Sequence, residues 1–117
     1  MPHVVLNGDI TVESVFSKFE PLFIRTDSCI MRTLDMFLER GGNSVLIECL
    51  VVDSGLKTSF LAMVSGREDG VVVRLYPKVE VEKTSGVKQI LAEIAKQLMR
   101  IFPTLKVGET NLDDYLK

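Results

Sequence analysis

SVLIECLVVDSGLKTSFLAMVSGREDGVVVRLYPKVEVE, residues 44–82, contains three consecutive runs rich in Val, Leu and Ile, divided by links rich in turn residues. We expect strands at 44–52, 57–65 and 71–82. The links at 53–56 and 66–69 are short enough for hairpins. This stretch therefore predicts an antiparallel three-stranded meander.

One register of this meander places only uncharged side chains on one face. It sets Val52 opposite Lys57 and Ser65 opposite Gly70. The uncharged face then collects Val45, Ile47, Cys49, Val51, Phe60, Ala62, Val64, Val71, Val73 and Leu75. Because a slip by one residue would turn a whole strand over, the agreement across three strands favours this register.

The opposite face of the meander is mixed, with apolar side chains around a few charges. Its candidate interface residues are Leu46, Glu48, Leu50, Leu61, Met63, Val72, Arg74 and Tyr76. In this register Glu48, Leu61 and Arg74 form one cross-strand row, so the two charges can meet over Leu61. A second apolar face needs cover. Both the helix predicted at 11–20 and a second subunit are candidates for that cover.

Three segments outside the meander have the spacing of amphipathic helices. Thr11 can cap a helix at 11–20, and Ile30, Leu34, Phe37 and Leu38 indicate a helix at 28–40. The longest apolar stripe predicts a helix at 85–102, ended by Pro103. Residues 22–25 are either a loop or an edge strand.

These elements predict a single α+β domain over residues 1–117. Its core is a three- to four-stranded antiparallel meander packed by amphipathic helices, in the order α-α-β-β-β-α. We expect the helices at 28–40 and 85–102 on the uncharged face, and the helix at 11–20 on the other face or at an end. The tail at 78–82 then needs a pairing partner, which can be 3–6, 105–107 or another copy of the chain.

Composition restricts the partners and the location. The net charge is −2 and the pI is near 5.4, so no global positive field draws in nucleic acid, which is disfavoured as a partner. The longest uncharged apolar run, 49–52, is far too short to cross a membrane, and no secretory signal is visible. Cys29 and Cys49 lack metal-site spacing. We expect free thiols in a cytoplasmic protein.

Residues that could carry catalysis are scarce. His3 is the single histidine, which argues against hydrolytic triads, and no nucleotide, metal or cofactor motif appears. Cys29 would stand in the first turn of a helix, where a thiol can become reactive, but no companion base accompanies it. Glu48 interrupts an apolar strand, and a pair with Arg74 or simple exposure explains it better than proton transfer. We expect neither an enzyme nor a cofactor or metal.

Basic residues before and along the last predicted helix give a weak signal for nucleic-acid binding. These are Lys83, Lys88, Lys96 and Arg100. A helix, three antiparallel strands and a helix in that order resemble the double-stranded RNA-binding domain and the signal-recognition-particle Alu-binding subunits. The double-stranded RNA-binding domain carries a run of lysines at the start of its last helix, where this chain has Lys88 alone.

The sequence thus favours a non-enzymatic interaction or scaffolding module that binds protein, foremost a second copy of itself, through the mixed sheet face or the edge at 78–82. An RNA-binding domain that uses the four basic residues is the alternative. A second alternative is a small-ligand binder with a site formed by Glu48, Arg74 and Tyr76.

Overall fold

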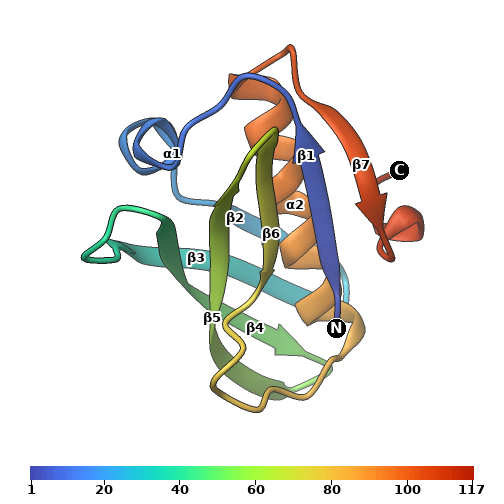
Figure 1. Cartoon of the computed structure of the whole chain (residues 1–117). Helices are drawn as coiled ribbons and strands as arrows, with labels where there is room; N and C mark the ends of the chain where they lie inside the picture. The colour runs from blue at the N-terminus through green and yellow to red at the C-terminus, as the bar shows by residue number, and fades with distance from the viewer.

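The computed structural model describes residues 1–117 and consists of one curled antiparallel sheet with two α-helices (Figure 1). In chain order the elements are β1 (His3–Asn7), α1 (Val12–Lys18), β2 (Phe23–Arg25), β3 (Cys29–Leu38), β4 (Ser44–Asp53), β5 (Leu56–Arg67), β6 (Gly70–Leu75), α2 (Ser85–Ile101), β7 (Lys106–Thr110) and a 3-10 turn, η1 (Asp113–Tyr115).

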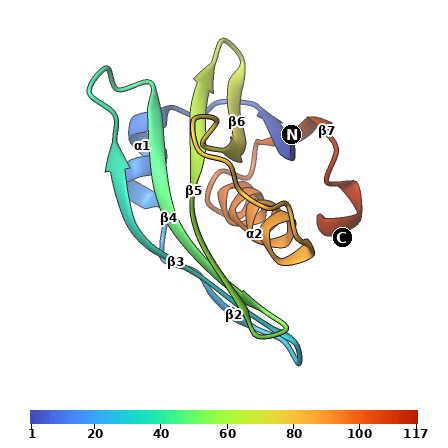
Figure 2. The same cartoon turned by 90° about the horizontal axis from the view of Figure 1, so that it is seen from below.

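The sheet has seven strands in the order β2-β3-β4-β5-β6-β1-β7, and every neighbouring pair is antiparallel. It curls into a half-barrel, and α2 lies in its hollow (Figures 1 and 2). The N-terminal strand β1 is inserted between β6 and β7, far from its neighbours in sequence. The sheet is thus completed by both ends of the chain.

This architecture corrects the predicted fold. The three- to four-stranded meander in the order α-α-β-β-β-α is wrong, because the sheet has seven strands and the chain has two α-helices. The resemblance in element order to RNA-binding domains falls with it. Three short strands and one misread helix account for the difference.

The misread helix is β3. Thr33 pairs with Cys49 and Met36 pairs with Ile47, so β3 advances three residues while β4 advances two. This bulge breaks the alternation of side chains along the strand. Apolar residues on the two sides of the bulge consequently fall at helix-like intervals, which is why residues 28–40 gave a false helical pattern.

The central meander is confirmed, and so is the composition of its uncharged face. Val52 lies opposite Lys57 as predicted, and Asp53 pairs with Leu56 across a tight turn in which Ser54 and Gly55 have positive φ. The second hairpin is also tighter than predicted, since Ser65 lies opposite Val72 instead of Gly70. That register differs by two residues, so each side chain keeps its face.

The predicted third strand is too long. β6 ends at Leu75, before Pro77, and residues 78–82 form no strand, so the proposed binding edge at 78–82 does not exist. Instead β1 pairs with β6, and β7 pairs with β1. The segments 3–6 and 105–107 do contribute strands, but to each other and to β6. The short segment at 23–25 is an edge strand.

Both helices cover the inner, uncharged face. α2 begins after its N-cap Thr84, and Ile90, Leu91, Ile94 and Leu98 are fully buried against the sheet. α1 is capped by Thr11, as predicted, and its Val15 belongs to the same core cluster. The helix at 11–20 was predicted on the mixed face or at an end of the sheet. The first of these positions is wrong, because α1 packs on the inner face.

A buried amide joins the two helical regions. The Gln97 side chain of α2 accepts a hydrogen bond from the Glu20 backbone N–H (2.7 Å) and donates one to the Glu20 carbonyl (2.9 Å). Gln97 is nearly as buried as its apolar neighbours. Gln97 thereby gives hydrogen-bond partners to the backbone N–H and carbonyl of Glu20, in the connection between α1 and β2. Without Gln97 these groups would be buried away from water with no partner.

Candidate functional site

The candidate site is the outer face of the sheet, defined here by the eight predicted interface residues and their neighbours on the same side of β3 to β6. The pairings place all eight on one face: Leu46, Glu48 and Leu50 on β4, Leu61 and Met63 on β5, Val72 and Arg74 on β6, and Tyr76 just after it. In Figure 2, α1 lies behind β3 and β4, on the inner side. No helix covers the outer face.

Most of this face is half-buried by its own side chains. Met63 is 7% exposed, and the other seven residues are of intermediate exposure. The apolar groups are therefore shielded from water only in part, which is the state expected of a surface that gains free energy when something covers it.

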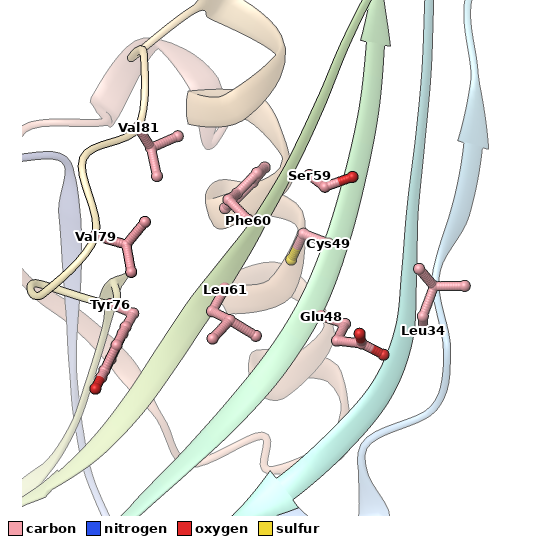
Figure 3. Close-up of a pocket in the computed structure, with 9 residues that line it drawn as sticks. All are labelled: Leu34, Glu48, Cys49, Ser59, Phe60, Leu61, Tyr76, Val79 and Val81. Carbon is pink, nitrogen blue, oxygen red and sulfur yellow. The ribbon is translucent and has the colours of Figure 1, made fainter.

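A groove of about 380 Å³ crosses the outer face. Its lining residues on the outer face are Leu34, Glu48, Ser59, Leu61 and Tyr76, joined by Val79 and Val81 and by Cys49 and Phe60, whose side chains belong to the inner face (Figure 3). The segment after β6 forms one wall through Tyr76 and Val79, and Leu34 of β3 lies at the opposite side. A second hollow, over Leu46 and Met63, shares Tyr76 with the groove. The groove is thus mainly apolar, whereas Glu39 and Lys78 give the second hollow charged walls.

The predicted row of Glu48, Leu61 and Arg74 needs correction. Glu48 lies opposite Leu61, but Arg74 lies opposite Met63, two residues further along β5. The two charges make no ion pair. The Glu48 carboxylate points towards β3, away from Tyr76, and accepts a long hydrogen bond from the Asp35 backbone N–H (3.3 Å). Arg74 Nε is shielded from solvent and has no hydrogen-bond partner.

This geometry separates the members of the predicted small-ligand site. Glu48 and Tyr76 line the groove at opposite sides, and Arg74 is not among its lining residues. A ligand in the groove would therefore not meet all three side chains together. The groove remains apolar, with one carboxylate at its margin.

Aromatic side chains extend the outer face beyond the predicted residues. Phe23 of β2 is 62% exposed and Phe37 of β3 is 50% exposed. Phe23 pairs with Arg32, whose guanidinium lies over its ring, and Phe37 pairs with Leu46. Sequence reasoning missed both, because it placed residue 37 in a helix and left 22–25 unassigned. No sequence signal identified them, because the bulge breaks the alternation in β3 and the three residues of β2 are too few to show a period.

The four basic residues of the RNA-binding alternative do not form one patch. Lys83 and Lys88 line a small hollow at the start of α2. Lys96 is engaged by Glu93 (3.0 Å) and by the Lys117 carbonyl (3.2 Å), and Arg100 lies near the other end of the helix. The helix presents two separated basic sites with an acidic partner between them, which is a poor match to a phosphate backbone.

The two cysteines are both free, in unlike surroundings. Cys49 faces the core, and burial raises the pKa of its thiol to about 12, with a smaller increase from the nearby Glu48 charge, opposed by a hydrogen bond from the Ala62 backbone. Cys29 opens β3 instead of a helix, and burial and the Asp53 carboxylate raise its pKa. Neither thiol is activated, since raised pKa values disfavour the thiolate.

No group of three His, Cys, Asp or Glu side chains could hold a metal ion, and no helix is long and apolar enough to span a bilayer. His3 lies on β1, with Nε2 3.4 Å from Glu109. Comparisons with protein-family models, curated proteins and solved structures gave no match to this chain.

Proposed function

We propose that this protein is a non-enzymatic protein-interaction module that forms a homodimer through the outer face of its sheet. The observation that carries the proposal is the placement of both helices on the inner face. Leu46, Leu50 and Leu61 are left without a helix over them and keep intermediate exposure. Burial of such apolar surface is the main source of stability in permanent dimers.

A second copy is the occupant that the charges favour. Glu48 and Arg74 share the outer face, have opposite signs and are not paired within the chain. A two-fold axis that runs between the two faces, midway between these residues, sets Glu48 of each copy over Arg74 of the other. Both charges are then satisfied twice by one symmetric contact.

We also place this module in the cytoplasm. Cys29 and Cys49 are free thiols, and thiols stay reduced in that compartment.

Light scattering coupled to size-exclusion chromatography tests the dimer across a range of protein concentrations. We expect a mass near twice 13.1 kDa for the unaltered chain. Leu61→Lys should give a monomer, because it places a charge at the centre of the interface. Thr104→Lys adds the same charge on an exposed turn and should remain dimeric.

Charge exchange identifies the contact. Glu48→Arg and Arg74→Glu should each weaken dimerisation about tenfold or more, since each opposes like charges in a partly dry interface. The double exchange should restore much of the affinity. A mass of 13.1 kDa for the unaltered chain at every concentration would overturn the proposal.

A further inference from the structure

The sheet has one edge that is open and apolar. β2 pairs with β3 only from Ile30 to Arg32, and the last bond between the segments joins the Thr33 N–H to the Leu22 carbonyl. Beyond this point β3 continues to Leu38 with β4 on one side and no strand on the other. In Figure 2 this half of β3 is the outermost strand, and α1 stands behind it.

This edge has two of the usual protections against pairing, the bulge and the Asp35 carboxylate, but its other side chains are apolar. Leu34, Phe37 and Leu38 are 41%, 50% and 39% exposed, and no Lys or Pro lies between 34 and 38. Natural edge strands are normally guarded by such residues. The other edge of the sheet, β7, carries Lys106 and Glu109 and pairs irregularly with β1. Of the other unpaired edges, β2 has three residues, and the half of β5 from Leu56 to Phe60 carries Lys57. The open half of β3 is therefore the edge best suited to receive a strand.

The two sides of this edge differ in chemistry. Glu39 lies two residues after Phe37, so both point to the outer side, and Asp35 lies at the bulge, where its backbone N–H donates to the Glu48 carboxylate on that same side. Met36 and Leu38 pair with Ile47 and Val45 and point to the inner side. A strand that fits here carries basic side chains on its outer side and apolar side chains on its inner side.

A second copy of β3 is a poor match. In the symmetric antiparallel register centred on Met36, Leu34 of one copy lies opposite Leu38 of the other, and Asp35 lies opposite Phe37 instead of a basic residue. In the register centred on Phe37, Asp35 lies opposite Glu39, and in the one centred on Asp35 that carboxylate meets itself. Like charges directly opposite each other destabilise a sheet. Two of these three registers oppose like charges, and none sets a basic side chain opposite Asp35 or Glu39, so a second copy complements the charges of this edge poorly.

We propose that the open edge of β3, from Leu34 to Leu38, binds an extended peptide of another protein by strand addition, and that this peptide alternates basic and apolar residues. Backbone hydrogen bonds to β3 hold the strand, and side-chain alternation selects it. The site shares Leu34 and Phe37 with the margin of the proposed dimer face and does not depend on the dimer, since strand addition extends the sheet sideways.

A synthetic seven-residue peptide that alternates lysine and valine is the probe. Titration into the full chain, followed by NMR, should shift the resonances of residues 34–38 and slow amide exchange there. The same peptide with proline at its central valine should not bind, because proline removes a backbone donor and breaks the strand. A peptide that alternates glutamate and valine should bind more weakly.

Neutral variants test the charge selection. Asp35→Asn with Glu39→Gln should weaken binding of the lysine peptide about fivefold, as expected for two exposed charge pairs. Glutamine at 39 can still accept the hydrogen bond that Glu39 Oε1 receives from the Asn43 N–H. Asp113→Asn with Asp114→Asn removes equal charge at a distant turn and should leave binding unchanged.

Several outcomes would overturn this proposal. They are the absence of binding at millimolar peptide, equal binding of the proline peptide, and protection outside β3. Concentration-dependent protection of residues 34–38 without peptide would show self-pairing and would also contradict it. Leu61→Lys, which should break the proposed dimer, should bind the peptide normally, so the two proposals can fail separately.

Discussion

The inner and outer faces of this sheet come from the same strands and use similar apolar residues, yet only one of them is covered. Along β4, Val45, Ile47 and Val51 are fully buried beneath the helices, while Leu46 and Leu50, between them in sequence, are partly exposed. Side-chain alternation reveals that two apolar faces exist. It does not reveal which face the helices take, since that depends on how the chain enters and leaves the sheet.

A charge placed on each face gives the largest expected contrast. Ile47→Asp should prevent cooperative folding, because an unpaired buried carboxylate costs several kcal/mol out of a total stability of roughly 5–15 kcal/mol. Leu46→Asp, one residue away, should fold and lose about 1 kcal/mol, with both changes made in the Leu61→Lys chain so that loss of the proposed dimer does not contribute. Circular dichroism with urea titration distinguishes them. Equal losses would mean that the outer face is as buried as the core.

High pH probes the inner face through Cys49. Its folded-state pKa is about 12 against an ordinary 9.0, so the folded protein favours the neutral thiol. The resulting stabilisation is complete below pH 9 and is lost as the pH rises towards 12, by up to ~4 kcal/mol. Urea titrations at several pH values should show a steeper decline for the unaltered chain than for Cys49→Ala. Parallel declines would contradict this.

Gln97 is the polar exception on the inner side, and its removal should have an intermediate effect. Gln97→Leu leaves the Glu20 N–H and carbonyl without partners and should cost about 2–3 kcal/mol. Gln89→Leu is the matched control, because Gln89 lies on a more exposed side of α2 and bonds to Glu93 and Tyr115. We expect the control to cost about 1 kcal/mol or less. A reversed order in thermal unfolding would refute the role of the Gln97 bridge.

The smallest effect is a difference in labelling between the two thiols. Cys29 is partly exposed and Cys49 is buried. A disulfide reagent at pH 8 should therefore modify one thiol per folded chain, slowly because the pKa of Cys29 is raised, and the second only after unfolding. Cys29→Ser should abolish the first phase. Rapid labelling of both thiols in the folded chain would show that the inner face is open to solvent.

The predictable part of this fold is its local part. β4, β5 and most of β6 follow from alternation within hairpins, and α2 follows from an uninterrupted stripe that begins at Val87. The outer-face residues were correctly grouped for the same reason, because a register error of two residues does not change a face.

The remainder depends on contacts between distant segments or on irregular geometry. β1 and β7 are short, and their pairing joins residues about one hundred positions apart. The bulge in β3 gives its apolar residues a helix-like spacing, so the sequence did not predict this strand. The exposed Phe37 and the open edge of β3 could therefore not be predicted either. The expected Glu48–Arg74 pair does not form, because the β5–β6 register differs by two residues from the predicted one. That shift moves Arg74 along the sheet away from Glu48 but leaves it on the same face.

The insertion of β1 between β6 and β7 has a consequence for synthesis. β1 leaves the ribosome before its partner β6 and stays unpaired until residues 70–74 follow it, and β7 cannot dock until β1 is in place. Residues 3–7 therefore remain without a partner strand while residues 8–69 are made. Chains stalled or shortened before β6 should be prone to aggregate, since they present a strand whose neighbours have not yet been made.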